Sequence, residues 1–251
     1  MGLIVNRVQV RLPGFPPSSA PLRIGHLSDF HLGHFASEKQ VTTAVEAANQ
    51  EAPDIIALTG DYVTEGKRFI ERIGALLAPL RAPLGVHAVL GNHDHQANGG
   101  RVESALREVG LQVLHNCSRP LEWQPAGRQP VRLALVGVDD LWRGKGDTAE
   151  ALKDVPQGLP AVVLSHNPDA VYPLRERPST LILAGHTHGG QVFRLGRYLL
   201  DGTRFGKRYP YGLHRLGEAQ VYITSGIGTT LLPIRFFCPA EVAILSITGT
   251  A

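Results

Sequence analysis

Short apolar runs, each followed at once by polar residues, are the feature that most constrains how this chain can fold. Runs of this length between polar or turn residues are typical of buried β-strands. We expect such strands over residues 22–28, 54–59, 86–90, 131–138, 161–165, 181–184, 221–224 and 242–247. The sequence therefore predicts a fold built around buried strands.

Two helical patterns separate the first three of these runs. Apolar residues recur at helix-like spacing over residues 38–52 and 67–80. Strand, helix and strand in units of this length favour parallel pairing, which brings the carboxyl ends of the strands to one edge of a sheet. A further helix is expected over 101–109, and it precedes strands near 112–115 and 121–123. We expect an α/β fold in which two sheets form a sandwich.

The composition excludes several classes of protein. The sequence has 25 Lys and Arg residues and 22 Asp and Glu residues. This balance is too even to indicate a protein whose main partner is nucleic acid. With Cys117 and Cys238 as the only cysteines, a disulfide framework or a thiolate zinc site is not expected. No apolar run approaches the roughly 20 residues of a membrane-spanning helix, and residues 1–11 do not resemble a signal peptide. We expect one domain over residues 1–251, located in the cytoplasm or peripherally on a membrane.

Side chains suited to metal binding or proton transfer follow the predicted strands directly. Asp29 and Asp61 are 61 − 29 = 32 residues apart, and Asp61 and Asn92 are 92 − 61 = 31 residues apart. Each interval matches one strand–helix–strand unit, which returns the chain to the same edge of the sheet. The candidates that we expect to converge are Asp29, His31, Asp61, Asn92, His93, Asp94, His166, His186 and His188.

This set of side chains contains what two adjacent divalent cations require, namely a bridging anion and further oxygen and nitrogen donors. Asp61 can bridge two metals, one of which takes Asp29, His31 and His188 and the other Asn92, His166 and His186. With a bridging hydroxide the site keeps a charge of about +1, which attracts a phosphate ester. Mixed oxygen and nitrogen ligands suit Mn²⁺, Fe or Zn²⁺ better than Mg²⁺ or Ca²⁺, and we expect manganese first.

Five motifs in a fixed order carry a resemblance to a known family. They are SDFHLG at 28–33, GDY at 60–62, GNHD at 91–94, SHNP at 165–168 and GHTHGGQ at 185–191. The chain resembles the calcineurin-like metallophosphoesterases. The resemblance implies a two-sheet β-sandwich flanked by α-helices in four layers, and hydrolysis of a phosphate ester by a hydroxide between two metals. It also implies that the metal ligands are Asp29, His31, Asp61, Asn92, His166, His186 and His188.

The resemblance further implies roles for two residues beside the ligands. His93 is expected to contact the substrate phosphate and to protonate the leaving oxygen, as an imidazole can. Asp94 is expected behind the ligands, where it fixes the loop or a neighbouring imidazole. His34 and His95 flank the motifs and are candidates for the substrate rim. Each histidine alone has an ordinary explanation as a core or surface residue, so their joint occurrence carries the assignment.

A basic and aromatic segment over 193–215 follows the last motif. Arg204, Lys207 and Arg208 can form a cationic rim for an anionic head group or an acidic membrane surface, although an ordinary solvated loop or hairpin explains the segment equally well. Together with the apolar segment 225–239, the motifs resemble a bacterial branch containing membrane-associated phosphoesterases and UDP-diacylglucosamine hydrolases. That branch implies a lipid-linked or nucleotide-sugar substrate.

Three functions remain as alternatives. The first is hydrolysis of a phosphodiester or pyrophosphate bond at a two-metal centre. The second is a non-catalytic metal- or phosphate-binding module that acts at a membrane or on a partner. The third is a metal-dependent nuclease, which ranks last because no separate nucleic-acid-binding segment is apparent in the sequence.

Overall fold

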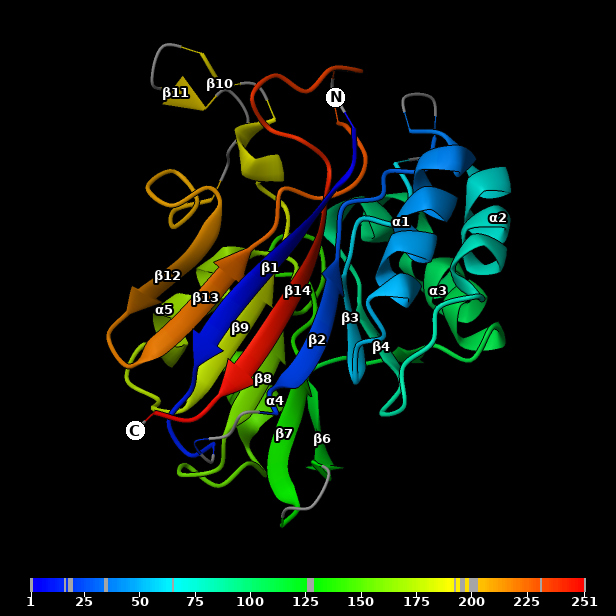
Figure 1. Ribbon diagram of the computed structural model, residues 1–251. Helices are drawn as coiled ribbons and strands as arrows, with labels where there is room; N and C mark the ends of the chain where they lie inside the picture. The colour runs from blue at the N-terminus through cyan, green and yellow to red at the C-terminus, as the bar shows by residue number, and fades with distance from the viewer. Residues whose placement is uncertain are drawn as a thin grey trace.

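The computed structural model consists of two six-stranded sheets that pack against each other, with helices along their outer faces (Figure 1). It describes residues 2–250 except 16, 18, 19, 34, 35, 65, 126–128, 192, 195, 196, 199–202 and 231. Of residues 193, 194, 197 and 198 only the backbone is described.

The first sheet has the strand order β1-β14-β2-β3-β4-β5. Strands β2 to β5 run parallel, whereas β14 is antiparallel to β2 and parallel to β1. Their bounds are β1 Ile4–Arg11, β2 Leu22–Leu27, β3 Ile55–Thr59, β4 Val86–Val89, β5 Gln112–Val113 and β14 Glu241–Thr248. Helices α1 (Glu38–Gln50), α2 (Lys67–Leu77) and α3 (Asn92–Glu108) connect the parallel strands. The predicted alternation of strand and crossover helix is therefore confirmed.

The second sheet has the order β12-β13-β9-β8-β7-β6, with four parallel central strands and an antiparallel strand at each edge. Its strands are β6 Cys117–Trp123, β7 Val131–Gly137, β8 Ala161–Leu164, β9 Thr180–Ala184, β12 Gly212–Leu216 and β13 Ala219–Ile223. Helices α4 (Thr148–Leu152) and α5 (Val171–Leu174), the 3₁₀ turns η1 (Pro168–Ala170) and η2 (His188–Gly190), and the hairpin β10 (Phe193–Arg194) and β11 (Arg197–Tyr198) complete the fold.

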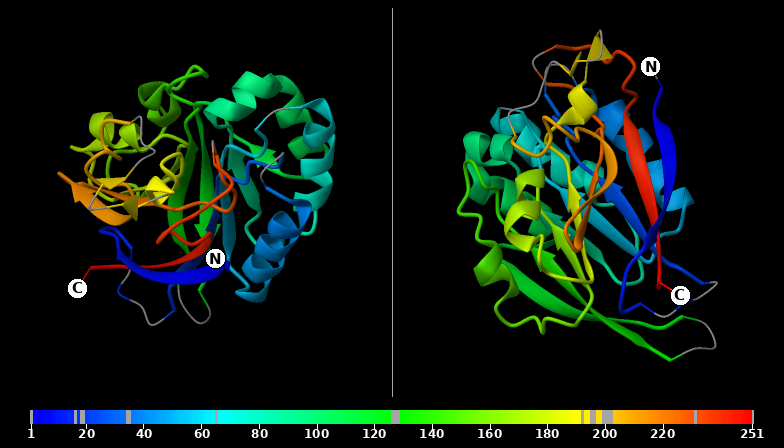
Figure 2. Two further views of the ribbon diagram at one scale, coloured as in Figure 1. Left: turned by 90° about the horizontal axis from the view of Figure 1, so that it is seen from above. Right: turned by 90° about the vertical axis from the view of Figure 1, so that its left-hand side faces the viewer.

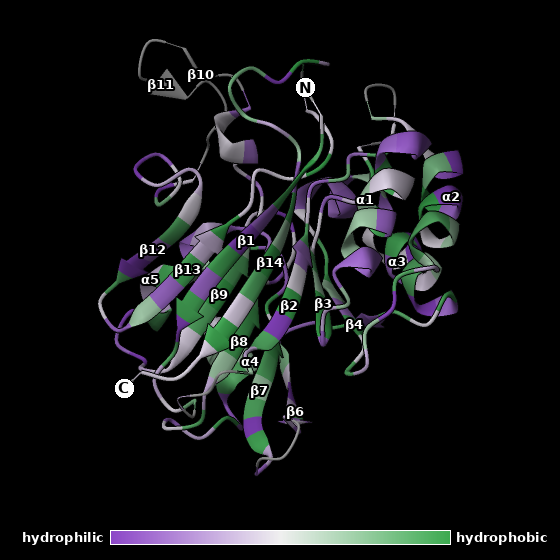
Figure 3. Cartoon of the chain, viewed as in Figure 1, coloured by the Kyte–Doolittle hydropathy of each residue, from purple (hydrophilic) through white to green (hydrophobic). Residues whose placement is uncertain are grey.

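Successive residues of a strand supply different layers of the core, because side chains alternate between the faces of a sheet. Ile56 and Leu58 pack toward the first helical layer, while Ile55 and Ala57 pack between the sheets. A third cluster covers the outer face of the second sheet. Figure 2 shows the two sheets and their flanking helices from above, and Figure 3 shows the central strands as the most apolar part. The predicted four-layer α/β sandwich is confirmed.

Three features differ from the expectation. Strand β1 was not predicted, because it lies at an edge and its residues alternate between exposed and half-buried. Helices α4 and α5 were not predicted, whereas the hairpin β10–β11 and the start of β12 at Gly212 fall in the segment 193–215, for which a solvated loop or hairpin was one interpretation. Helix α3 begins at Asn92 rather than at residue 101, and extended backbone at Asn98 divides it. Among the described residues no helix is long and apolar enough to cross a bilayer.

A single glycine tests how closely α2 and α3 pack. A Cβ atom at Gly74 would lie 2.5 Å from the backbone oxygen of Ala105. Alanine is better than glycine by about 1 kcal/mol inside a helix, yet overpacking typically costs about 1–3 kcal/mol. We therefore expect Gly74→Ala to lower the free energy of unfolding in urea. Gly100→Ala is the matched control, because its Cβ would meet nothing closer than 3.9 Å and its stability should hold or rise. A more stable Gly74→Ala protein would contradict this packing.

Candidate metal centre

The loops after five parallel strands meet where the two sheets adjoin. From the first sheet, Asp29 and His31 follow β2, Asp61 follows β3 and Asn92 follows β4. From the second sheet, a histidine follows β8 and two more follow β9. The structure brings all seven predicted ligand side chains together: Asp29, His31, Asp61, Asn92, His166, His186 and His188.

One group of donors comprises Asp29, His31 and His188, all buried, with ligand atoms within 4.8 Å of one another. The Nε2 atoms of His31 and His188 are 3.0 Å apart. Oδ1 of Asp29 lies 3.3 Å from His188 Nε2 and 3.9 Å from His31 Nε2. Three nitrogen and oxygen atoms thus face a common point.

A second group comprises Asp61, His166 and His186, again within 4.8 Å of one another. His166 Nε2 is 3.0 Å from His186 Nδ1, and Asn92 Oδ1 lies 3.1 Å from the former and 2.9 Å from the latter. The amide oxygen of Asn92 therefore completes this group of donors.

The Asp61 carboxylate connects the two groups. Its Oδ2 atom lies 3.4 Å from His31 Nε2 in one group and 3.2 Å from His166 Nε2 in the other. Its Oδ1 atom accepts a hydrogen bond of 2.9 Å from the backbone N–H of His93. The position of Asp61 is the one that a bridging ligand requires.

Charges in this cluster respond to burial and to one another. Burial lowers the pKa of His31 and of His186 to about 3, so both rings are neutral and offer lone pairs at neutral pH. Burial raises the pKa of Asp29 to about 6. Burial also opposes ionisation of Asp61, but the charge of His166 outweighs it and holds the pKa of Asp61 well below its usual range.

The surroundings of His166 test whether this donor set suits a cation. Burial disfavours a charged His166, yet Asp61 and Asp29 outweigh burial and raise the pKa of His166 to about 10. Its Nδ1 atom lies 2.7 Å from the carbonyl oxygen of Thr59, which directs Nε2 toward the cluster. A proton on Nε2 thus supplies positive charge at a point where several acceptor atoms converge. A divalent cation would supply the same positive charge, so the residues fit a metal.

An unusual backbone conformation aims these side chains. Asp29, Asp61 and His188 have φ values of 54°, 54° and 53°, in the left-handed region that residues other than glycine seldom occupy. The strain is held by pairing that continues beyond the strands, since the backbone N–H groups of Asp29 and His31 donate to the carbonyls of Gly60 and Asp61 at 2.9 Å. Strained backbone of this kind clusters at functional sites.

His93 and Asp94 both contact Asp61 from the first turn of α3. The ring of His93 is half-buried and its centroid lies 4.9 Å from that of His31, so it borders the cluster. The Asp94 carboxylate is buried and accepts backbone hydrogen bonds of 2.8–2.9 Å from Asp61, Tyr62 and Gly91. Asp94 thereby ties the loop after β3 to the start of α3.

Two carboxylates after β7 were absent from the predicted site. His95 Nε2 lies 2.7 Å from Asp139 Oδ1, and this hydrogen bond raises the pKa of His95. Asp140 is buried and accepts from the backbone N–H of Trp142, whose exposed ring stands edge-on to His186 at 4.3 Å. Both carboxylates directly follow a predicted strand, so the rule that found Asp61 would also have found them.

The expected basic rim is only partly described. His34 lies outside the described residues, while Arg204, Lys207 and Arg208 are exposed on the turn before β12. This turn is joined to the GHTHGGQ segment, because the Thr187 hydroxyl donates to the Pro210 carbonyl at 2.6 Å.

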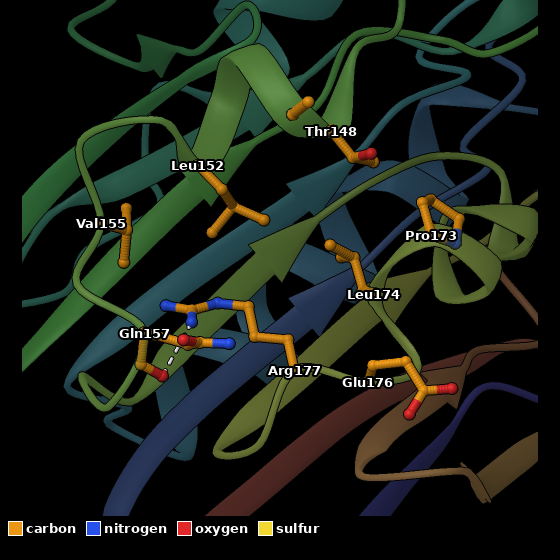
Figure 4. A pocket seen from close by; sticks show the side chains of 9 residues that line it. Thr148, Leu152, Val155, Gln157, Pro173, Leu174, Glu176 and Arg177 are labelled. Carbon is orange, nitrogen blue, oxygen red and sulfur yellow. Dashed lines mark hydrogen bonds between the residues drawn. The ribbon is translucent and has the colours of Figure 1, made fainter.

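A surface cavity between α4 and α5 has no part in this cluster. Its volume is ≈ 370 Å³, and its lining includes Thr148, Leu152, Leu174 and Arg177 (Figure 4). The Arg177 guanidinium donates to the Gln157 carbonyl at 2.9 Å, as the dashed line shows. None of the seven candidate ligands lines this cavity, so the chemistry belongs to the cluster between the sheets.

Solved structures share this fold. The Thermus thermophilus protein TT1561 aligns with a TM-score of 0.54 at 14% identity over 83% of this chain and 91% of that one. The 5′-nucleotidase precursor from the same organism aligns with a TM-score of 0.52 at 14% identity over 82% of this chain, which spans 49% of that longer structure. Similarity at this level of identity concerns the fold alone.

Sequence comparisons are more specific. The chain is 33% identical to the Escherichia coli protein named phosphodiesterase YaeI, over 96% of this chain and 87% of that protein. It is 28% identical to the Chlamydia trachomatis protein named UDP-2,3-diacylglucosamine pyrophosphatase LpxG, over 76% of this chain and 70% of that protein. Residues 22–190 match the sequence model described as calcineurin-like phosphoesterase. The chain therefore belongs to the calcineurin-like phosphoesterase family of phosphoric ester hydrolases.

Proposed function

We propose that this protein hydrolyses a phosphodiester or pyrophosphate bond at a centre of two divalent metal ions. The observation that carries the proposal is the position of Asp61 Oδ2, at 3.4 Å from His31 and 3.2 Å from His166, between the two groups of donors. Asp29, His31 and His188 would hold one metal, and Asn92, His166 and His186 would hold the other, with Asp61 shared. When bound, two divalent cations supply a nucleophilic water and offset negative charge on the phosphate.

The chain's own residues then bind, orient and protonate. His93 lies in the first turn of α3, beside His31 and with its backbone N–H on the Asp61 carboxylate, so its imidazole can contact the phosphate and donate a proton to the leaving oxygen. Asp94 holds the loop from beneath through backbone hydrogen bonds. Trp142 and His95 border the centre from the side of β7 and contribute to the substrate rim.

The relatives indicate which phosphate bond is cleaved, and the donor atoms indicate which metals can bind. The names of YaeI and LpxG favour a diester or a pyrophosphate over a monoester, and the latter favours a lipid-linked nucleotide-sugar substrate. Peripheral contact with a membrane agrees with such a substrate. The mixed oxygen and nitrogen donors suit manganese, iron or zinc, and manganese is our first candidate.

Replacing the shared carboxylate should disable metal binding and turnover together. We expect Asp61→Asn to lower the Mn²⁺-dependent hydrolysis of bis(p-nitrophenyl) phosphate by more than about 100-fold, because ligand changes cost at least as much as changes behind the ligands. Elemental analysis should show less bound manganese than in the wild type. Asp147→Asn, at the start of α4, is the matched control and should retain both properties. Full manganese content and turnover in Asp61→Asn would refute the shared ligand.

Replacing the expected proton donor should affect turnover without affecting the metal. His93→Ala is expected to lower kcat by about 10²–10⁴-fold, the usual contribution of general acid catalysis. The loss should be greatest for alkyl leaving groups and least for p-nitrophenolate, which departs without a proton. His95→Ala serves as the comparison and should show no dependence on the leaving group. An equal loss for all leaving groups would assign His93 to phosphate binding alone.

The same measurements separate the alternatives. Stoichiometric metal uptake without turnover of any phosphate ester would favour a non-catalytic metal- or phosphate-binding module. Cleavage of single-stranded DNA or RNA, with a steep dependence on salt, would favour a nuclease.

A further inference from the structure

Large apolar side chains stand exposed on one short turn between β13 and β14. The exposed fractions of Leu232, Ile234, Phe236 and Phe237 are 46%, 54%, 52% and 70%. We call residues 232–237 the apolar tip. Single exposed apolar residues are ordinary, but a contiguous group marks a surface that contacts something other than water. Figure 3 shows this connection at the end of the molecule where the N-terminus lies.

The apolar tip presents no charge to its surroundings. Its one charged residue, Arg235, is half-buried and turns inward, where Nε donates to the carbonyl oxygen of Gly228 at 2.9 Å and Nη1 to that of Cys238 at 3.5 Å. Phe237 is held exposed at a left-handed φ of 56°, a conformation unfavourable for a bulky residue. A turn that remains in water gains no stability from an exposed phenylalanine on unfavourable backbone.

The apolar tip is fixed to the segment that carries the candidate ligands. The side-chain oxygen of buried Gln191 accepts from the backbone N–H of Thr230 at 2.9 Å, and its amide donates to the carbonyls of Thr230 and Leu232 at 2.9 Å each. The backbone N–H of Phe236 donates to the carbonyl of Gln191 at 3.0 Å. The Cys238 thiol donates to the carbonyl of His188 at 3.1 Å. Whatever the tip contacts is therefore held beside the metal centre.

Basic side chains lie on a second turn at the same end of the molecule. Arg204, Lys207 and Arg208 are exposed on the turn joined to Thr187, and Figures 1 and 2 show that region and the β13–β14 connection at one end of the sheets. Residues 203–217 and 226–240 contain no Asp or Glu. The Asp169 carboxylate lies against the basic turn, where it accepts from the backbone N–H groups of Arg204 and Phe205 at 2.9 and 2.7 Å. An apolar tip at the same end of the molecule as three exposed cations is complementary to an anionic lipid surface.

We propose that the apolar tip enters the outer layer of an anionic phospholipid bilayer while Arg204, Lys207 and Arg208 contact the head groups. A protein partner would need polar groups on the tip to set its orientation, whereas hydrocarbon needs none. The inference deepens the proposed function, on whose lipid-linked substrate it rests, because it names the surface that brings the substrate to the metal centre.

The test is co-sedimentation of the full chain with vesicles of phosphatidylcholine alone or mixed equally with phosphatidylglycerol. We expect the wild type to bind the mixed vesicles more strongly. Phe236→Ser with Phe237→Asn should weaken that binding by at least about tenfold, since buried apolar area sets interfacial affinity. Asparagine is chosen at 237 because it tolerates left-handed backbone.

Charge is tested separately by a matched pair of double variants. Lys207→Glu with Arg208→Glu should abolish the preference for phosphatidylglycerol, while Arg119→Glu with Arg132→Glu, an equal charge change on β6 and β7, should keep it. Thermal melting verifies that each variant is folded, and turnover of bis(p-nitrophenyl) phosphate in the absence of lipid reports on the proposed function independently.

Each outcome of the vesicle experiment either supports or overturns the proposed membrane contact. Vesicle binding that survives loss of both phenylalanines, or a folded wild type that binds neither vesicle, would overturn the proposal even if the enzyme is active. Concentration-dependent dimerisation lost in the phenylalanine variant, without vesicle binding, would instead identify the tip as a contact between copies of this chain. Vesicle binding by a protein without turnover would support the membrane contact but remove the proposed function, and with it the role of the tip in bringing substrate to the metal centre.

Discussion

The buried negative charge of Asp61 is the constraint on which the rest of the site depends. Its carboxylate lies 2% exposed between imidazoles from both sheets, and its Oδ1 atom accepts one backbone hydrogen bond while Oδ2 faces the rings. A carboxylate in that position needs nearby positive charge, which His166 supplies as a proton carrier and divalent cations supply more completely. The neutral rings of His31 and His186 cannot supply it. A cation bound at this position would therefore stabilise the folded state of this region.

The ligand cluster also depends on left-handed backbone conformations, which regular strands do not contain. The chain turns into left-handed conformation directly after β2, β3 and β9, at Asp29, Asp61 and His186. Continued pairing between the loops and the backbone hydrogen bonds that Asp94 accepts compensate for that strain. Glycines allow the close approach, since a Cβ at Gly185 would lie 2.2 Å from the Asp29 carboxylate. The loops are thus positioned by rigid contacts, which suits a centre that must fix several ligands at once.

The sequence predicts most of this arrangement because buried strands and crossover helices leave strong periodic patterns. The interval between Asp29 and Asp61 alone places both at one sheet edge, as the structure has them. Strand β1 escaped detection because an edge strand with mixed exposure lacks a continuous apolar run. Asp139 was overlooked although it follows a predicted strand. The edge-on contact of Trp142 with His186 depends on a loop conformation that no local pattern encodes.

The segment after β9 links the chemistry to the surface of the molecule. His186 and His188 face the two groups of donors, while Gln191, three residues later, anchors the connection that carries the apolar tip. Thr187 joins the same segment to the basic turn. A displacement of the tip would therefore strain hydrogen bonds that hold the ligand loop in its left-handed conformation. Hydrogen bonds within this one short segment thus join the apolar tip, the basic turn and the candidate ligands His186 and His188.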